Sequence, residues 1–148
     1  MRPAIRLLAG LLLAGLALAS SLPGAAPAPP RVLPAPARPE ASPAREAFEA
    51  RRSGVWLRAE GEVVRILRDD LEGRRHQRFI LRLPDGLTVL ISHNIDLAPR
   101  VPVEKGDEVE VFGRYEWNKR GGVIHWTHTD PRGRGPGGWI RHREKTYR

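Results

Sequence analysis

The sequence contains no cysteine. The protein therefore has no disulfide, no thiol nucleophile and no cysteine-ligated zinc, and it carries no lipid on an N-terminal cysteine. Motifs with a known chemical mechanism are absent as well: there is no Gly-x-Ser-x-Gly elbow, no His-Glu-x-x-His helix and no phosphate-binding loop. The spacing of serine, histidine and aspartate does not support a catalytic triad. Any function must be argued from less specific patterns.

One long apolar run stands out, at residues 7–19. It follows Arg2 and Arg6 and ends in an Ala-Leu-Ala sequence, which are the basic start and small-residue end of a secretory signal peptide. At about 13 residues the run is shorter than the ~20 that a membrane-spanning helix needs. We therefore expect residues 1–19 to be a signal peptide, the protein to be periplasmic or secreted, and no stable membrane span to remain after cleavage. The alternative is an uncleaved N-terminal anchor.

Proline and alanine dominate residues 20–43, in segments such as Ala28-Pro29-Pro30. This composition buries too little apolar surface to fold, and proline favours extended chain. We expect a disordered spacer here and a single folded domain at residues 44–148. The formal net charge of +8 becomes +6 without residues 1–19, which contain two arginines and no acid. A basic domain suits an anionic partner, although it also suits solubility.

The folded domain is predicted to begin with a short helix and to continue in five strands. Ser42 is a suitable N-cap, Pro43 suits the first helical position, and Gly54 would end the helix. The strand-like runs alternate apolar and polar residues. The first run shifts phase beside Gly61, as a β-bulge in a bent strand would produce. The predicted strands are residues 55–68, 76–83, 87–95, 107–118 and 123–129.

The order of these elements predicts the fold class, which is all-β. A long bent strand is followed by a hairpin with the turn Pro84-Asp85-Gly86, a connection at residues 97–105 and a second hairpin. This is the order of a five-stranded OB barrel. We therefore predict a small five-stranded OB-like barrel preceded by a short N-terminal helix. Another small barrel of SH3-like type is the alternative.

Histidines on the predicted strands are the best candidates for chemistry. Imidazole and carboxylate groups are good ligands for zinc or a similar divalent ion, and histidines also transfer protons. In a regular strand His125 and His128 point to opposite faces, so both can join one site only if the strand bends. The alternative is a set of structural histidines, above all His93, which lies on the apolar face of its strand. The predicted metal ligands are His93, His125, His128 and Asp130, and the catalytic residues of an enzyme would be His125 and His76.

The second candidate site is a basic ridge on and just before the predicted strand at residues 76–83, where Arg74, His76, Arg78 and Arg82 share one face. In an OB barrel, oligonucleotides and oligosaccharides bind the face of strands two and three, between the loops that join strands one to two and four to five. Arginines supply donors for phosphate or carboxylate, and a tryptophan ring can stack on a base or a sugar. The alternative is that these basic residues form an ordinary charged face exposed to solvent, with no ligand. The predicted ligand-binding residues are Arg74, Arg78, Arg82, Lys119, Arg120, Trp117 and Trp126.

Several short motifs are specific in combination. They are HQRF at 76–79, HNIDLAP at 93–99, YEWN at 115–118, GGVIHWTHTDP at 121–131 and GGWI at 137–140. Together they resemble the signature of a bacterial family of small exported domains of unknown function, over roughly residues 50–148. The resemblance implies a secreted OB-like module and supplies no reaction.

Two function classes follow from these patterns. The first is an exported OB-like binding module that contacts an anionic polymer, either nucleic acid or polysaccharide, or an envelope partner. The second is a secreted metal-dependent phosphodiesterase or nuclease, in which His125 is base or ligand and Arg78 neutralises phosphate. Only the second requires a cofactor, a divalent metal such as zinc. The binding module is the preferred prediction, and the oligomeric state stays open.

Overall fold

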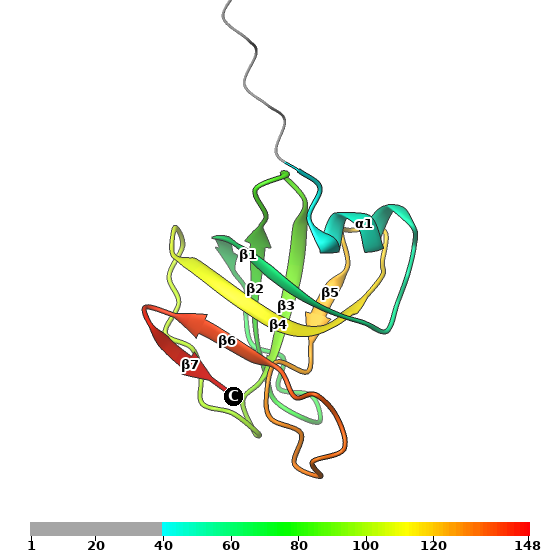
Figure 1. The fold of residues 1–148 in the computed structure, drawn as a ribbon. Coiled ribbons are helices and arrows are strands. Elements are labelled where there is room, and N and C mark those ends of the chain that lie inside the picture. The colour runs from blue at the N-terminus through cyan, green and yellow to red at the C-terminus, as the bar shows by residue number, and fades with distance from the viewer. Residues whose placement is uncertain (1–39) are drawn as a thin grey trace, which may run out of the picture. The chain divides into compact units, whose positions relative to one another are not determined.

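The structure is a computed structural model that describes residues 40–148. The predicted signal peptide and nearly all of the predicted spacer lie outside these residues. In the described part, no helix has the length and apolar character needed to cross a membrane. Helix α1 (Pro43–Glu49) is followed by seven strands (Figure 1): β1 (Val55–Ile66), β2 (His76–Arg82), β3 (Thr88–Asn94), β4 (Glu108–Glu116), β5 (Val123–His125), β6 (Trp139–His142) and β7 (Lys145–Tyr147).

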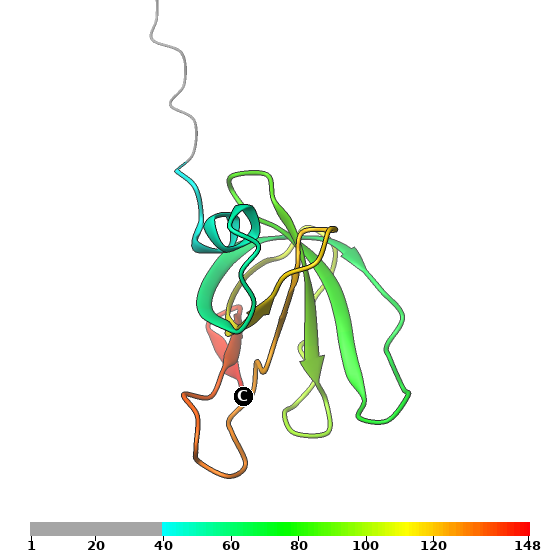
Figure 2. The same cartoon turned by 90° about the vertical axis from the view of Figure 1, so that its right-hand side faces the viewer.

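Five of the strands close into a barrel. Their order is β1-β2-β3-β5-β4, and β4 pairs with β1 to complete the circle (Figure 2). The β3–β5 pair is parallel and the other pairs of the barrel are antiparallel. This confirms the predicted all-β, OB-like barrel with a short helix before it. The barrel core lies between the strands, where alternate residues such as Phe79 and Leu81 of β2 are fully buried.

Local sequence explains the bend of β1 and the attachment of α1. The β1–β2 register shifts between Val63 and Arg65, so the strand carries the predicted bulge, close to Gly61. The Ser42 hydroxyl accepts a hydrogen bond from the Arg45 N–H (3.1 Å) and caps α1. Trp117 stacks on Phe48 (6.4 Å between ring centroids) and donates its indole N–H to the Phe48 carbonyl (3.1 Å). The helix is thereby fastened to the chain just after β4.

The C-terminal third of the domain differs from the prediction. The predicted strand at residues 123–129 is wrong beyond His125, because Trp126 adopts a left-handed backbone conformation (φ 55°) that ends β5. Strands β6 and β7 were not predicted. β6 pairs with residues 109–112 of β4 and buries Ile140 completely, so the end of the chain extends the sheet.

Candidate functional site

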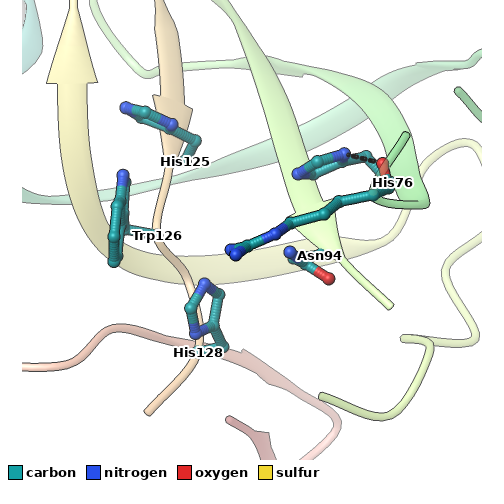
Figure 3. Close-up of a pocket in the computed structure, with 6 residues that line it drawn as sticks. His76, Asn94, His125, Trp126 and His128 are labelled. Carbon is teal, nitrogen blue, oxygen red and sulfur yellow. Dashed lines mark hydrogen bonds between the residues drawn. The ribbon is translucent and has the colours of Figure 1, made fainter. Parts of the chain in front are cut away.

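Three strand termini meet at one end of the barrel. β2 begins at His76, β3 ends at Asn94 directly opposite it, and β5 ends at His125. Loops 67–75 and 126–138 and the first part of the connection 95–107 lie at this same end (Figure 2). The termini enclose a pocket of about 120 Å³, here called the histidine pocket (Figure 3). It is lined by Arg74, His76, Asn94, His125, Trp126 and His128.

The backbone of Trp126 brings two histidines to the same pocket. A regular strand would place His125 and His128 on opposite faces. The positive φ of Trp126 breaks the alternation, and both rings line the pocket. This conformation costs an L-residue about 1–2 kcal/mol. Trp126 is 39% exposed, and its indole ring stacks on His128 (5.6 Å, 28°) and meets His125 edge-on (6.3 Å, 73°).

Backbone carbonyls fix the tautomers of two pocket histidines. His76 Nδ1 lies 2.7 Å from the Arg74 carbonyl oxygen, and His128 Nδ1 lies 2.8 Å from the Thr129 carbonyl oxygen. Because a carbonyl can only accept, each Nδ1 carries a proton and donates it. In the neutral ring, Nε2 is then the unprotonated nitrogen. These two rings are therefore oriented by the backbone, with their acceptor nitrogens left for a ligand.

His125 is held differently, against a carboxylate. Its Nε2 is buried without a hydrogen bond and lies 3.6 Å from Glu116 Oε1, an electrostatic contact longer than a hydrogen bond. Burial lowers the pKa of His125, and Glu116 only partly opposes that effect. His125 is therefore neutral at pH 7. Nε2 is buried on the Glu116 side, so Nδ1 is the nitrogen left for a ligand.

A second hollow of about 350 Å³ adjoins the histidine pocket and shares Arg74 and Trp126 with it. Here called the arginine groove, it is formed largely by the loop at residues 126–138. The Asp130 carboxylate accepts hydrogen bonds from the backbone N–H groups of Arg132 (3.0 Å) and Arg134 (2.9 Å), which hold its pKa below the usual value. The groove is lined by Arg74, Leu97, Trp126, Asp130, Pro131, Arg132 and Arg134.

His93 lies outside the pocket lining and has a structural role. It is fully buried, and its ring nitrogens contact the Thr127 hydroxyl (Nδ1, 2.8 Å) and the Pro99 carbonyl (Nε2, 3.1 Å). The carbonyl requires a donor, so Nε2 carries the proton and Nδ1 accepts from Thr127. Burial lowers the pKa of His93, which keeps the ring neutral. The residue thus ties β3 to the segment after β5.

The predicted metal ligands are only partly brought together. His125 and His128 share the pocket, whereas both nitrogens of His93 are bonded and the Asp130 carboxylate shapes its own loop. Among residues 40–148, no three histidine, aspartate or glutamate side chains are placed so that they could hold a metal ion. The metal site stays a prediction for which the described residues offer no three-ligand arrangement.

The predicted basic ridge is divided by internal contacts. Arg78 donates to the Arg68 carbonyl (Nη2, 2.9 Å), and Arg82 forms an ion pair with Glu62 (2.6 Å). Arg74 is the ridge arginine that lines both the pocket and the groove, and it forms no ion pair with any residue of the described part. It is therefore the ridge residue best placed to meet a ligand.

The other predicted binding residues lie elsewhere. Trp117 fastens α1, as described above. Lys119 and Arg120 lie on the turn before β5, where Gly121 packs against the Thr88 backbone at the start of β3. The histidine pocket lies at the other end of β3, about 20 Å away at ~3.3 Å per residue. Of the predicted ligand-binding set, Arg74 and Trp126 line the candidate site.

Three polar residues of the site are outside the predicted sets. Asn94 lines the pocket from the end of β3, and Arg132 and Arg134 line the groove. The Arg-Gly alternation at residues 132–135 was the available signal for the two arginines. No sequence pattern indicates that Asn94 belongs to the site, because its position opposite His76 follows from the β2–β3 register alone.

The family comparison covers the described domain. A family model described as "Protein of unknown function (DUF3465)" matches residues 32–148. The chain belongs to this family. No curated protein matches the chain. Because the DUF3465 description assigns no function, any proposal must rest on the geometry of the pocket and the groove.

Proposed function

We propose that the domain is a binding module for single-stranded nucleic acid and that the strand lies in the arginine groove with a base against Trp126. The main support for this proposal is the position of Trp126. Its partly exposed side chain lines both the histidine pocket and the arginine groove, and three arginines line the groove. Single strands are typically bound by a positive groove that follows the phosphates, together with aromatic rings on which bases stack. The groove offers both.

The charge balance of the groove supports phosphate binding. Several arginines on other parts of the surface are paired with carboxylates, as in Arg75–Asp96 (2.6 Å) and Arg82–Glu62 (2.6 Å). Arg74, Arg132 and Arg134 form no such pair with residues 40–148. Their guanidinium groups are free to donate to phosphate oxygens. The lining contains these three arginines and one carboxylate, Asp130, so the groove keeps a net positive charge.

The strained backbone at Trp126 supports a functional role for its ring. Strain of this kind persists where the surrounding structure requires it, and it is concentrated at binding and active sites. The stack on His128 holds the indole in place before a ligand arrives. A base that stacks on it therefore has little ordering cost, and such a contact contributes about 1–3 kcal/mol.

Fluorescence anisotropy with a short labelled RNA strand tests the proposal. Arg74→Glu should weaken binding about 10- to 100-fold, because a hydrogen bond to a charged group contributes about 1.5–3 kcal/mol. The slope of the salt dependence should also fall by about 0.7 for each phosphate that the variant no longer neutralises. The matched control is Arg52→Glu, the same charge change at an exposed arginine on the loop after α1.

Equal binding by the two variants would contradict the proposed location. A second arm uses a polyuronate chain in place of RNA. Binding of the polyuronate alone, unaffected by Trp126→Ala, would replace nucleic acid by an acidic polysaccharide as the ligand. For the metal-dependent phosphodiesterase, residues 40–148 supply no group of three ligands. The binding module is thus the function that the site supports best.

We also propose that the protein acts outside the cytoplasm, in the periplasm or as a secreted protein. Support comes from the basic, apolar and small-residue pattern of residues 1–19. On this proposal DUF3465 is a bacterial family of exported domains, marked by the motifs at residues 76–79, 93–99, 115–118, 121–131 and 137–140. N-terminal sequencing of the protein from fractionated bacteria checks it: export predicts a mature chain that begins near Ser20, and an intact N-terminus in the cytoplasmic fraction contradicts it.

A further inference from the structure

The histidine pocket holds three imidazoles, which are groups that can transfer protons. They line a space of about 120 Å³ together with one guanidinium and one amide, which can donate hydrogen bonds. Two of the imidazoles are oriented by backbone carbonyls and the third by a carboxylate. Groups oriented in this way are typical of general acid–base catalysis, which contributes about 10²- to 10⁴-fold in rate.

The lining has no hydroxyl, thiol or amine nucleophile. None of the six side chains around the pocket is a serine, threonine, tyrosine, lysine or cysteine. If the histidines act as acid and base, the nucleophile comes from the substrate or from water. In RNA the ribose 2′-hydroxyl lies next to the phosphodiester, and an attacking group held in this way gains the large advantage of an intramolecular reaction. The pocket composition therefore suits RNA better than DNA.

We propose that the histidine pocket cleaves single-stranded RNA by transfer of the phosphoryl group to the 2′-oxygen, with His125 as general base and His76 as general acid. The proposal rests on the proposed function, because the groove must deliver the strand to the pocket. His125 and His76 lie on opposite sides of the pocket, so one can serve the attacking oxygen and the other the leaving oxygen (Figure 3).

The proton balance of the step is complete without a further reactant. The 2′-oxygen forms a bond to phosphorus and gives its proton to Nδ1 of His125. The bond from phosphorus to the 5′-oxygen of the next nucleotide breaks, and that oxygen takes a proton from Nε2 of the His76 imidazolium. The products are a 2′,3′-cyclic phosphate and a free 5′-hydroxyl.

Other residues of the pocket have supporting parts in this step. Arg74 donates to the non-bridging phosphate oxygens, on which negative charge grows in the transition state. Glu116, 3.6 Å behind His125, stabilises the imidazolium that forms when the base takes its proton. Trp126 holds the neighbouring base and thereby positions the phosphodiester. His128 is a positioning residue that supports the indole by stacking.

The experiment compares three labelled strands of one sequence in the presence of EDTA: all RNA, all DNA, and DNA with a single ribonucleotide. The wild-type protein should cut the RNA, leave the DNA intact and cut the mixed strand only on the 3′ side of its ribose. Mass spectrometry should identify the cyclic phosphate. Cleavage of DNA, dependence on added metal, or a 3′-phosphate formed without a cyclic intermediate would each overturn the proposal.

Variants assign the activity to the pocket. His125→Ala and His76→Ala should each slow cleavage at least about 100-fold while RNA still binds. The matched control is His142→Gln, at a histidine of β6 that contacts Asp107 instead of the pocket (2.9 Å), and it should cleave at the wild-type rate. Melting curves show whether each variant is folded. The comparison of the three labelled strands uses the wild-type protein, so it tests the reaction even if a variant fails to fold.

The results separate this proposal from the one on which it rests. RNA binding that depends on Arg74 without any cleavage would overturn the reaction and keep the binding module. Absence of both binding and cleavage would overturn both. Cleavage at the same rate in the His125→Ala and wild-type preparations would show that the activity does not belong to this pocket.

Discussion

The strained backbone of Trp126 gives a sharp test of how the pocket is built. Trp126 has φ 55°, and this single conformation places His125 and His128 on the same pocket. If the strain is real, glycine should be better tolerated here than alanine. That would reverse the usual order, in which glycine in a strand is less stable than alanine by about 0.5–1 kcal/mol.

The expected difference follows from two opposing effects. Alanine at a left-handed position costs about 1–2 kcal/mol, a cost that glycine avoids. Alanine recovers about 0.4–1 kcal/mol because it restricts the unfolded chain. Trp126→Gly should therefore be more stable than Trp126→Ala by about 1 kcal/mol, or about 5 °C in Tm for a domain of this size. Both variants lack the ring that stacks on His128, so this difference isolates the backbone.

Urea denaturation of the two variants measures the difference in the free energy of unfolding. Thr88→Gly and Thr88→Ala form the matched control, because Thr88 is exposed in β3 and is not among the residues with positive φ. At Thr88 alanine should be the more stable variant. If Trp126→Ala is as stable as Trp126→Gly, the left-handed conformation is not what brings the two histidines together.

Further predictions concern buried groups and close packing. Thr127→Val removes the hydrogen-bond partner of Nδ1 of buried His93 and should cost about 1–3 kcal/mol in urea denaturation; unchanged stability would contradict this hydrogen bond. Because burial lowers the pKa of His93 and of His125, the unfolded chain binds more protons than the native one below the ordinary histidine pKa of 6.5. Stability should therefore be full above pH 6.5 and fall as the pH drops below it, and a Tm that rises on acidification would refute this. Gly122→Ala should cost about 2 kcal/mol or more, because φ is 91° and a Cβ would collide with the Tyr115 ring; a cost near zero would show that the turn can move.

The barrel was predictable because its strands alternate clearly. In β2, Gln77, Phe79 and Leu81 are buried, and the residues between them face outward, as their sequence pattern indicates. The hairpin turns and the bulge in β1 follow from glycine and proline positions. β6 and β7 span too few residues for alternation to be recognised. Their pairing with β4 and with each other is a tertiary contact that no local pattern reports.

The site was only partly predictable, because it depends on register and on one unusual backbone angle. No propensity places tryptophan at positive φ, so the convergence of His125 and His128 could not be derived from alternation. The outward direction of Arg78 and Arg82 was predictable. Their internal partners were not, since these arise from the pairing of β1 with β2. The sequence therefore singled out His76, His125 and Trp126, which line the pocket, without indicating their geometry.

The central claim is that the histidine pocket and the arginine groove form the ligand-binding site. The most direct measurement is the NMR spectrum of the histidine ring nitrogens, recorded while a short RNA strand is added to the slowly cleaving variant His76→Ala, which keeps Arg74. The account predicts that the signals of His125 and His128 shift while His142, on β6, stays unchanged. Saturable RNA binding that leaves His125 and His128 unmoved would place the ligand elsewhere and contradict the account.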